Sequence, residues 1–169
     1  MKKGRSLVDL ATELERQNTA KRDLLVDTPA LSLHPGDGQV QLNINKGFRA
    51  GAMEIEMLDI GDIAHSQIGD RTKIPAKYYN RMREEAPELL ATNVNHWFQN
   101  NPERRMVRTL DGRARAFLSD RYRRIDNQQI AEAVLPIIGE MAGAQIMSCE
   151  LTESKMYLKV VNPRIETEI

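Results

Sequence analysis

The sequence has few of the features that mark secreted or membrane-spanning proteins. It contains one cysteine, Cys149, so no disulfide can form within the chain, and a reducing compartment is expected. No apolar run approaches the ~20 residues that cross a bilayer. The basic N-terminus, residues 1–5, is not followed by the apolar stretch of a secretory signal. These absences predict a cytoplasmic protein that does not enter the membrane.

Motifs for metal or phosphate chemistry are also scarce. No two of the three histidines have the spacing of metal ligands, and one cysteine cannot build a zinc site. These histidines are His34, His65 and His96. The segment 36–38 (GDG) lacks the glycine-lysine-serine/threonine ending of a phosphate-binding loop. We therefore predict no cofactor and no bound metal, and a binding function is favoured over catalysis.

One acidic run, between residues 54 and 70, leaves an enzymatic alternative open. Glu54 and Glu56 are two residues apart on an expected strand, so they share a face on which a nuclease could hold Mg²⁺. The simpler interpretation is the solvated face of an edge strand. Whether the protein is an enzyme stays open at this point, with binding the favoured alternative.

The length of 169 residues fits one ordinary domain preceded by a short arm. Ser6 is expected to cap a helix that continues to about Arg22. Prolines and glycines over 23–38 indicate a loop. The sequence thus predicts a helix and linker over residues 1–38 and a core domain over residues 39–169.

In the rest of the chain, apolar residues alternate with polar ones in some segments, as in strands, and recur at helical spacing in others. Expected strands are 39–45, 51–58, 106–110, 114–118, 144–151 and 155–161, and expected helices are 75–85, 87–99 and 126–141. Asp111-Gly112 is typical of a type I′ hairpin turn, in which both central residues have positive φ. Pro136 predicts a kink or break near Leu135. The order of elements predicts an α+β fold of antiparallel β hairpins packed by α-helices.

Residues 106–127 read MVRTLDGRARAFLSDRYRRIDN and resemble a signature of domain-of-unknown-function family 932, whose members are encoded by phages and plasmids. The segments 133–136 (AVLP) and 151–161 (LTESKMYLKVV) fit the same resemblance, which covers about residues 50–165. It implies a role in DNA metabolism or host takeover, with phage single-strand annealing proteins as a looser analogy. Family members continue with a further β-rich part, so the resemblance implies a truncated or short member. A strand-like segment at 164–169 is compatible with a homo-oligomer.

Positive charge is concentrated in one short segment, although the chain has no net charge. Residues 104–124 hold eight arginines and two aspartates, a balance of +6. Guanidinium groups present a planar fork of donors that suits phosphate, and a tyrosine among them can stack on a base. The predicted nucleic-acid-binding residues are Arg104, Arg105, Arg108, Arg113, Arg115, Arg121, Tyr122, Arg123 and Arg124.

Other interpretations of the arginine segment remain open. The arginines also fit a solvated or ion-paired surface, or an interface for an acidic protein. Trp97 and Phe98 end an apolar helical stripe and are expected in the core. Of the adjacent Tyr78 and Tyr79, one is expected to face inward and the other outward.

The favoured hypothesis is a phage- or plasmid-derived nucleic-acid-binding protein. It would bind or anneal single-stranded DNA in recombination or replication. The alternative is a host-interaction protein that binds a host protein, such as an inhibitor of a defence system, and a Mg²⁺-dependent nuclease is less favoured.

Overall fold

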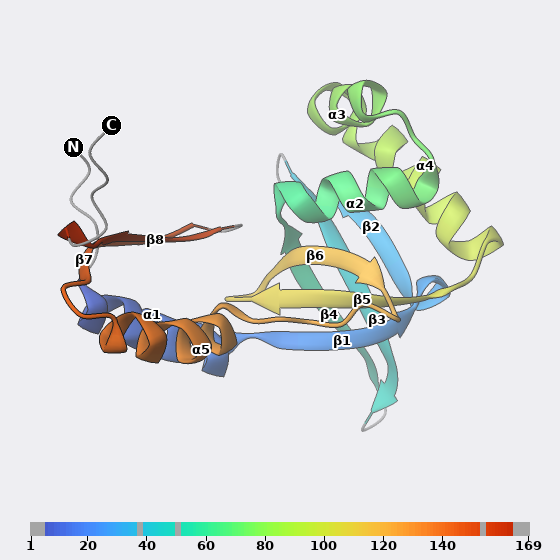
Figure 1. The fold of residues 1–169 in the computed structure, drawn as a ribbon. Helices are drawn as coiled ribbons and strands as arrows, with labels where there is room; N and C mark the ends of the chain where they lie inside the picture. Colours follow the sequence, from blue (N-terminus) through green and yellow to red (C-terminus); the bar gives the residue numbers. More distant parts are fainter. Residues whose placement is uncertain (1–5, 37–38, 50–51, 153–154, 164–169) are drawn as a thin grey trace. The chain divides into compact units, whose positions relative to one another are not determined.

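The structure, a computed structural model, describes residues 6–36, 39–49, 52–152 and 155–163 (Figure 1). The chain divides into two compact units, one comprising Met1–Ala20 with Arg123–Ile169 and the other comprising Lys21–Tyr122. Helices and strands occur in both units, so the predicted α+β class is confirmed. No helix in the described part of the chain has the length and apolarity needed to span a bilayer.

A six-stranded sheet forms the framework of the unit Lys21–Tyr122. Its strands are β1 (Arg22–Asp27), β2 (Leu31–Pro35), β3 (Val40–Arg49), β4 (Ala52–Ile60), β5 (Arg104–Leu110) and β6 (Arg113–Ser119). They lie in the order β1-β5-β6-β4-β3-β2. The predicted hairpins β3–β4 and β5–β6 are antiparallel, whereas β4 pairs with β6 in parallel. The sheet is therefore mixed, and β6 joins its two halves.

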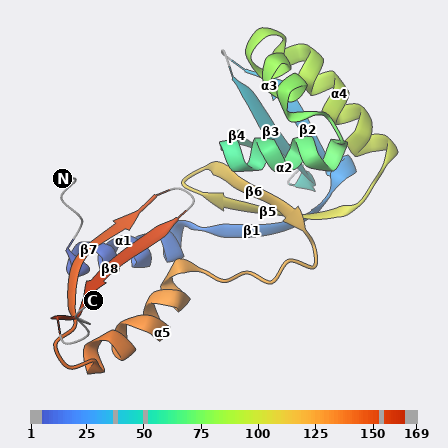
Figure 2. The ribbon, with the colours of Figure 1, turned by 45° about the horizontal axis from the view of Figure 1, so that its top comes forward.

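The helices α2 (Asp62–Thr72) and α4 (Pro87–Asn100) pack on one face of this sheet, and α3 (Ala76–Glu85) packs on these two helices (Figures 1 and 2). The helices and the sheet share one buried cluster, in which Leu90 and Val94 of α4 meet Leu33 and Leu42 of the strands. Phe98 also lies in this core, stacked on Phe117 of β6 with ring centroids 5.6 Å apart. Burial of these apolar side chains is the main stabilising contribution.

The prediction of a loop over residues 23–38 is wrong for most of that segment. Residues 22–27 and 31–35 form β1 and β2, joined by a 3₁₀ turn at Thr28–Ala30 that contains Pro29. Pro35 ends β2, which lies at the edge of the sheet, where a missing N–H donor is tolerated. The boundary predicted at residue 38 thus falls between two strands that pair with each other.

Helix α2 was not among the expected elements. Its buried residues include His65, Gly69 and Thr72 beside Ala64 and Ile68. Because small and polar residues occupy much of the buried side, the apolar period that normally indicates a helix is weak.

The second unit contains α1 (Leu7–Ala20), α5 (Asn127–Glu140) and the antiparallel pair β7 (Gln145–Leu151) and β8 (Met156–Val161). Its buried residues are Leu10, Leu14, Ala131 and Cys149. Asp126 and Gln129 form a reciprocal capping box at the start of α5. The helix continues through Pro136, so the expected break is absent. The strand-like segment 164–169 lies outside the described residues.

The larger apolar residues along α5 and at its C-terminal end lie mostly on the exposed side of the helix. Ile130, Val134, Ile137 and Met141 are all exposed, whereas Ala131 is buried and Leu135 is partly buried. The helix therefore packs on α1 with its smaller apolar side, and α1 in turn packs on β7.

The β5–β6 turn provides a test of the fold. Asp111 and Gly112 have φ values of 51° and 75°, which confirms the predicted turn. A Cβ on Gly112 would meet no atom within 4 Å, so Gly112→Ala carries only the backbone cost of positive φ. We expect a loss of about 1–2 kcal/mol in the free energy of unfolding, measured by urea denaturation.

The matched control is Gly139→Ala. Gly139 is in α5, and its added Cβ also meets no atom within 4 Å. In a helix this change stabilises by about 0.5–1 kcal/mol. Equal effects of the two substitutions would contradict the left-handed backbone at Gly112.

Candidate nucleic-acid interface

The β5–β6 hairpin separates the predicted arginines along its length. In the antiparallel β5–β6 pair, Leu110 lies opposite Arg113 beside the turn, and Arg105 lies opposite Ser119 near the open end. These two ends lie roughly 17 Å apart, because they are separated by five residues of β5 and a strand rises about 3.3 Å per residue. A bulge between the two pairs brings both Ala114 and Phe117 to the buried side of β6. The arginines therefore do not form one continuous row.

Arg108 lies in a buried ion pair. Its Nε donates to Oδ1 of Asp23 over 2.9 Å, and Asp23 is its direct neighbour across the β1–β5 ladder. The two side chains are 9% and 5% exposed. A guanidinium group held in this way is not available to a phosphate. Arg108 therefore has a structural role and does not belong to the exposed part of the predicted set.

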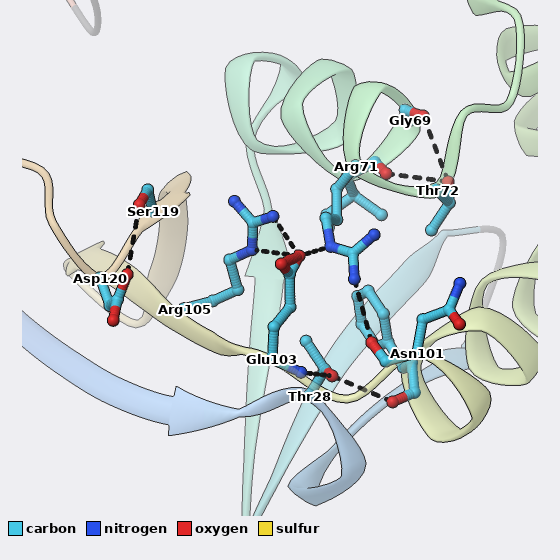
Figure 3. Close-up of polar contacts among 11 residues, drawn as sticks. Thr28, Gly69, Arg71, Thr72, Asn101, Glu103, Arg105, Ser119 and Asp120 are labelled. Atoms are coloured by element: carbon cyan, nitrogen blue, oxygen red, sulfur yellow. Dashed lines mark hydrogen bonds and ion pairs between the residues drawn. The ribbon is translucent and has the colours of Figure 1, made fainter.

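Arg105 shares a carboxylate with an arginine from a distant helix. Its Nε donates to Oε1 of Glu103 over 3.0 Å, and the same oxygen forms an ion pair with Nε of Arg71 in α2. Figure 3 shows the two guanidinium groups on either side of Glu103. Arg71 also donates to the carbonyl oxygen of Asn101 over 3.0 Å. We refer to Arg71, Glu103 and Arg105 as the Glu103 cluster.

The Glu103 cluster has more positive than negative charge. Two guanidinium groups face one carboxylate, so about one charge is left without compensation inside the cluster. Burial and the neighbouring Arg105 lower the pKa of the Arg71 guanidinium. Burial also lowers the pKa of Arg105, while the carboxylate of Asp120 opposes this effect. Each guanidinium remains protonated at neutral pH because arginine is not deprotonated in proteins.

Thr28 fixes the position of Glu103. Its buried hydroxyl donates to the carbonyl oxygen of Phe98 over 3.0 Å and accepts the backbone N–H of Glu103 over 3.1 Å. The backbone N–H of Thr28 donates to the carbonyl oxygen of Glu103 over 2.9 Å. These bonds connect the turn after β1, the end of α4 and the start of β5. The Glu103 carboxylate is thus held on a rigid part of the unit (Figure 3).

Exposed members of the predicted set lie at the open end of the hairpin. Arg104 starts β5, Arg121 follows β6, and both are exposed. Among the residues that the structure describes, neither has an ion-pair partner. Tyr122 is also exposed, at 44%. Arg104, Arg121 and Tyr122 therefore lie at the same end of the hairpin as the Glu103 cluster. Arg104 and Arg105 are successive strand residues, so the side chain of Arg104 points to the opposite face of the sheet.

The other predicted arginines lie elsewhere. Arg113 is exposed beside the turn and Arg115 is partly buried at the bulge, and both interact with neighbouring groups. Arg123 and Arg124 are exposed but belong to the unit that contains α1 and α5. These four residues are therefore not assigned to the open end of the hairpin.

Sequence reasoning missed Arg71 and Glu103. Arg71 lies outside the basic segment, on a helix with a weak periodic signal, and Glu103 precedes the segment by one residue. An acidic residue directly before the arginines was the one available indication that part of their charge is compensated.

The carboxylates weighed as a nuclease site are engaged with cations. Glu56 forms ion pairs with Arg22 and with Lys46, whose Nζ lies 2.7 Å from Oε2. Lys46 also lies 3.6 Å from Glu54. In the described part of the chain, no group of three or more His, Cys, Asp or Glu side chains is placed to hold a metal ion.

Helix α3 is fastened to α2 by a buried polar pair. Nδ1 of His65 lies 2.9 Å from the Tyr79 hydroxyl, and both side chains are about 2% exposed. A Cβ on Gly69 would approach the Tyr79 ring to 3.1 Å, so glycine there permits the close packing. Tyr79 faces inward and Tyr78 outward, as predicted.

The chain was compared with family models, curated proteins and solved structures, and no match was found in any of the three comparisons.

A first prediction concerns Asp23 and Arg108. Removing one member of a buried ion pair leaves an uncompensated charge, which costs about 3–5 kcal/mol of unfolding free energy. We expect Asp23→Ala to destabilise the protein by about this amount in urea denaturation. The double variant Asp23→Leu/Arg108→Met should recover most of the loss, because two apolar side chains of similar size replace the pair. Equal destabilisation by both variants would contradict this assignment.

A second prediction concerns pH. Burial lowers the pKa of His65 from 6.5 to about 4. The unfolded chain therefore binds a proton between these pH values that the folded chain does not, and stability falls as pH decreases through this window. The difference in pKa corresponds to about 3 kcal/mol at most. We expect His65→Gln to be less stable than the wild type at pH 7, with the gap narrowing towards pH 4. A constant gap would contradict the buried neutral imidazole.

Proposed function

We propose that the protein binds nucleic acid through the open end of the β5–β6 hairpin. The observation that carries this proposal is the sharing of the Glu103 carboxylate by Arg71 and Arg105, with exposed Arg104 and Arg121 at the same end of the hairpin. Arginine suits this role because its planar fork matches two phosphate oxygens. The Glu103 cluster supplies a fixed positive field, and the exposed arginines supply direct phosphate contacts.

The rigidity of the Glu103 cluster supports binding. Arg71 and Arg105 are only 17% and 19% exposed, and Arg105 also lies over the Phe117 ring, 5.8 Å from its centroid. Side chains that are already ordered lose little conformational entropy when a ligand binds. Tyr122, next to Arg121, adds an exposed ring on which a base can stack.

The biological setting that we propose is the binding or annealing of single strands in phage- or plasmid-linked recombination or replication. This setting rests on the resemblance of residues 106–127 and not on the geometry of the site. The phosphate contacts alone do not discriminate between bases, because base edges carry the sequence information.

The test is a salt series with a labelled oligonucleotide, in which binding is followed by fluorescence anisotropy. Each phosphate contact with a single strand contributes about 0.7 to the slope of log K against log salt concentration. We expect Arg104→Ala/Arg121→Ala to bind about tenfold more weakly at low salt and to reduce the slope by roughly 1.4. Arg108 is not suitable for this test because its removal affects folding.

The matched control is Arg16→Ala/Lys159→Ala, which removes two positive charges from exposed positions in the other unit. It should bind with nearly wild-type affinity, because salt screens the effect that a change in net charge alone has on binding. Equal weakening by both double variants would contradict a localised site. Absence of binding by the wild type even at low salt would reject the proposal and favour an acidic protein partner.

A further inference from the structure

A groove lies where α2, α3 and α4 meet, next to the Glu103 cluster. Its volume is about 410 Å³, which falls within the usual range for small-molecule sites. Residues from the end of α2 and the connection to α3 line one part, and Tyr78, Trp97 and Asn101 line the other. Arg71 belongs to both the groove and the Glu103 cluster. The groove therefore adjoins the positive region of the proposed interface.

Two aromatic side chains of the groove are unusually exposed. Tyr78 is 48% exposed and Trp97 is 40% exposed, whereas the neighbouring Tyr79 and Phe98 are almost fully buried. The ring of His96 packs against Trp97 nearly at a right angle, with centroids 5.2 Å apart. The expectation that Trp97 lies in the core is therefore wrong, while the same expectation for Phe98 is confirmed. An indole and a phenol in one groove offer surfaces for a planar ligand.

The positive charge at the groove determines which kind of planar ligand it suits. Lys73 is exposed and, within the described ranges, has no ion-pair partner, and Arg71 adds a second cation. Lys73 has a φ of 56°, a conformation in which glycine is the usual residue. Aromatic faces beside cations favour a ligand that combines a flat ring with negative charge. A nucleotide has this combination, whereas a cationic peptide would be repelled.

We propose that this groove binds one unpaired nucleotide of a nucleic-acid strand, with the base against Tyr78 and Trp97 and a phosphate near Lys73. The proposal deepens the proposed function and rests on it, since neighbouring phosphates of the same strand would contact the open end of the hairpin. A base that is paired within a duplex cannot enter a groove of this kind. The groove therefore makes the protein selective for single strands over duplex.

Trp97 provides a direct readout because it is the only tryptophan in the chain. A base stacked on the indole quenches its emission. The probe is an oligothymidylate of about ten nucleotides, within the range bound by one single-strand-binding module. The comparison is the duplex that it forms with oligoadenylate. We expect the single strand to quench Trp97 and the duplex to leave its emission unchanged.

Two variants retain Trp97 and test the neighbouring groups. Tyr78→Ala should weaken single-strand binding roughly tenfold, as expected for the loss of one stacking partner. Lys73→Gly should also weaken it several-fold. Because glycine readily adopts positive φ, this variant is expected to be at least as stable as the wild type. Weaker binding by Lys73→Gly would therefore result from the lost charge and not from unfolding. The control is Lys159→Ala, which removes the same charge outside the groove and should bind like the wild type.

The outcomes separate this inference from the proposed function. If the oligonucleotide binds by anisotropy but does not quench Trp97, and Tyr78→Ala binds normally, the groove proposal is overturned and the hairpin interface stands. If Trp97 is quenched while Arg104→Ala/Arg121→Ala binds like the wild type, the hairpin interface is overturned and the groove stands. Absence of both binding and quenching overturns both. Equal quenching by single strand and duplex overturns the selectivity for single strands.

Discussion

The sheet of the unit Lys21–Tyr122 depends on the pairing of β5 with β6. This hairpin lies between β1 on one side and β4 on the other, so it joins strands that would otherwise belong to separate pieces. Its tight turn requires positive φ at Asp111 and Gly112, which fixes the register of the two strands. The turn lies at one end of β5 and leaves Arg104 at the other, while the separate β1–β5 register places Arg108 opposite Asp23. The hairpin turn thus sets the pairing at the centre of the sheet, and the pairing of β5 with β1 decides that Arg108 is buried.

Charge compensation divides the arginine segment into structural and accessible members. Arg108 is fully paired in the sheet, and Arg105 shares a carboxylate with Arg71, whereas Arg104 and Arg121 remain exposed. A row of charges along one strand face would have suggested a continuous phosphate track. We propose instead that binding is confined to one end of the hairpin. The groove with Tyr78 and Trp97 adjoins the Glu103 cluster through Arg71, so we propose that stacking and phosphate contacts act on one strand.

Much of the fold could be predicted from local patterns. The strands β3 to β8, the helices α3 and α4 and the hairpin turn follow from periodicity and from turn and capping residues. The strands β1 and β2 were missed because Pro29 and Pro35 obscured short alternating runs. Helix α2 was missed because His65 and Gly69 replace apolar residues on its buried side. In both cases tertiary packing stabilised elements whose local signals were weak.

The sequence by itself determined the concentration of arginines, the Asp111-Gly112 turn and the alternation that builds the central hairpin. Only the tertiary structure decided which arginines are accessible. Asp23 and Arg108 are 85 residues apart in sequence, and Arg71 precedes Glu103 by 32 residues. The tertiary structure also brought Tyr78, Trp97 and Lys73 to one groove. The physical reason is that periodicity reports each residue's immediate neighbours along the chain. Whether a charge is compensated, or an aromatic ring is exposed, depends instead on residues from strands and helices that are distant in the sequence.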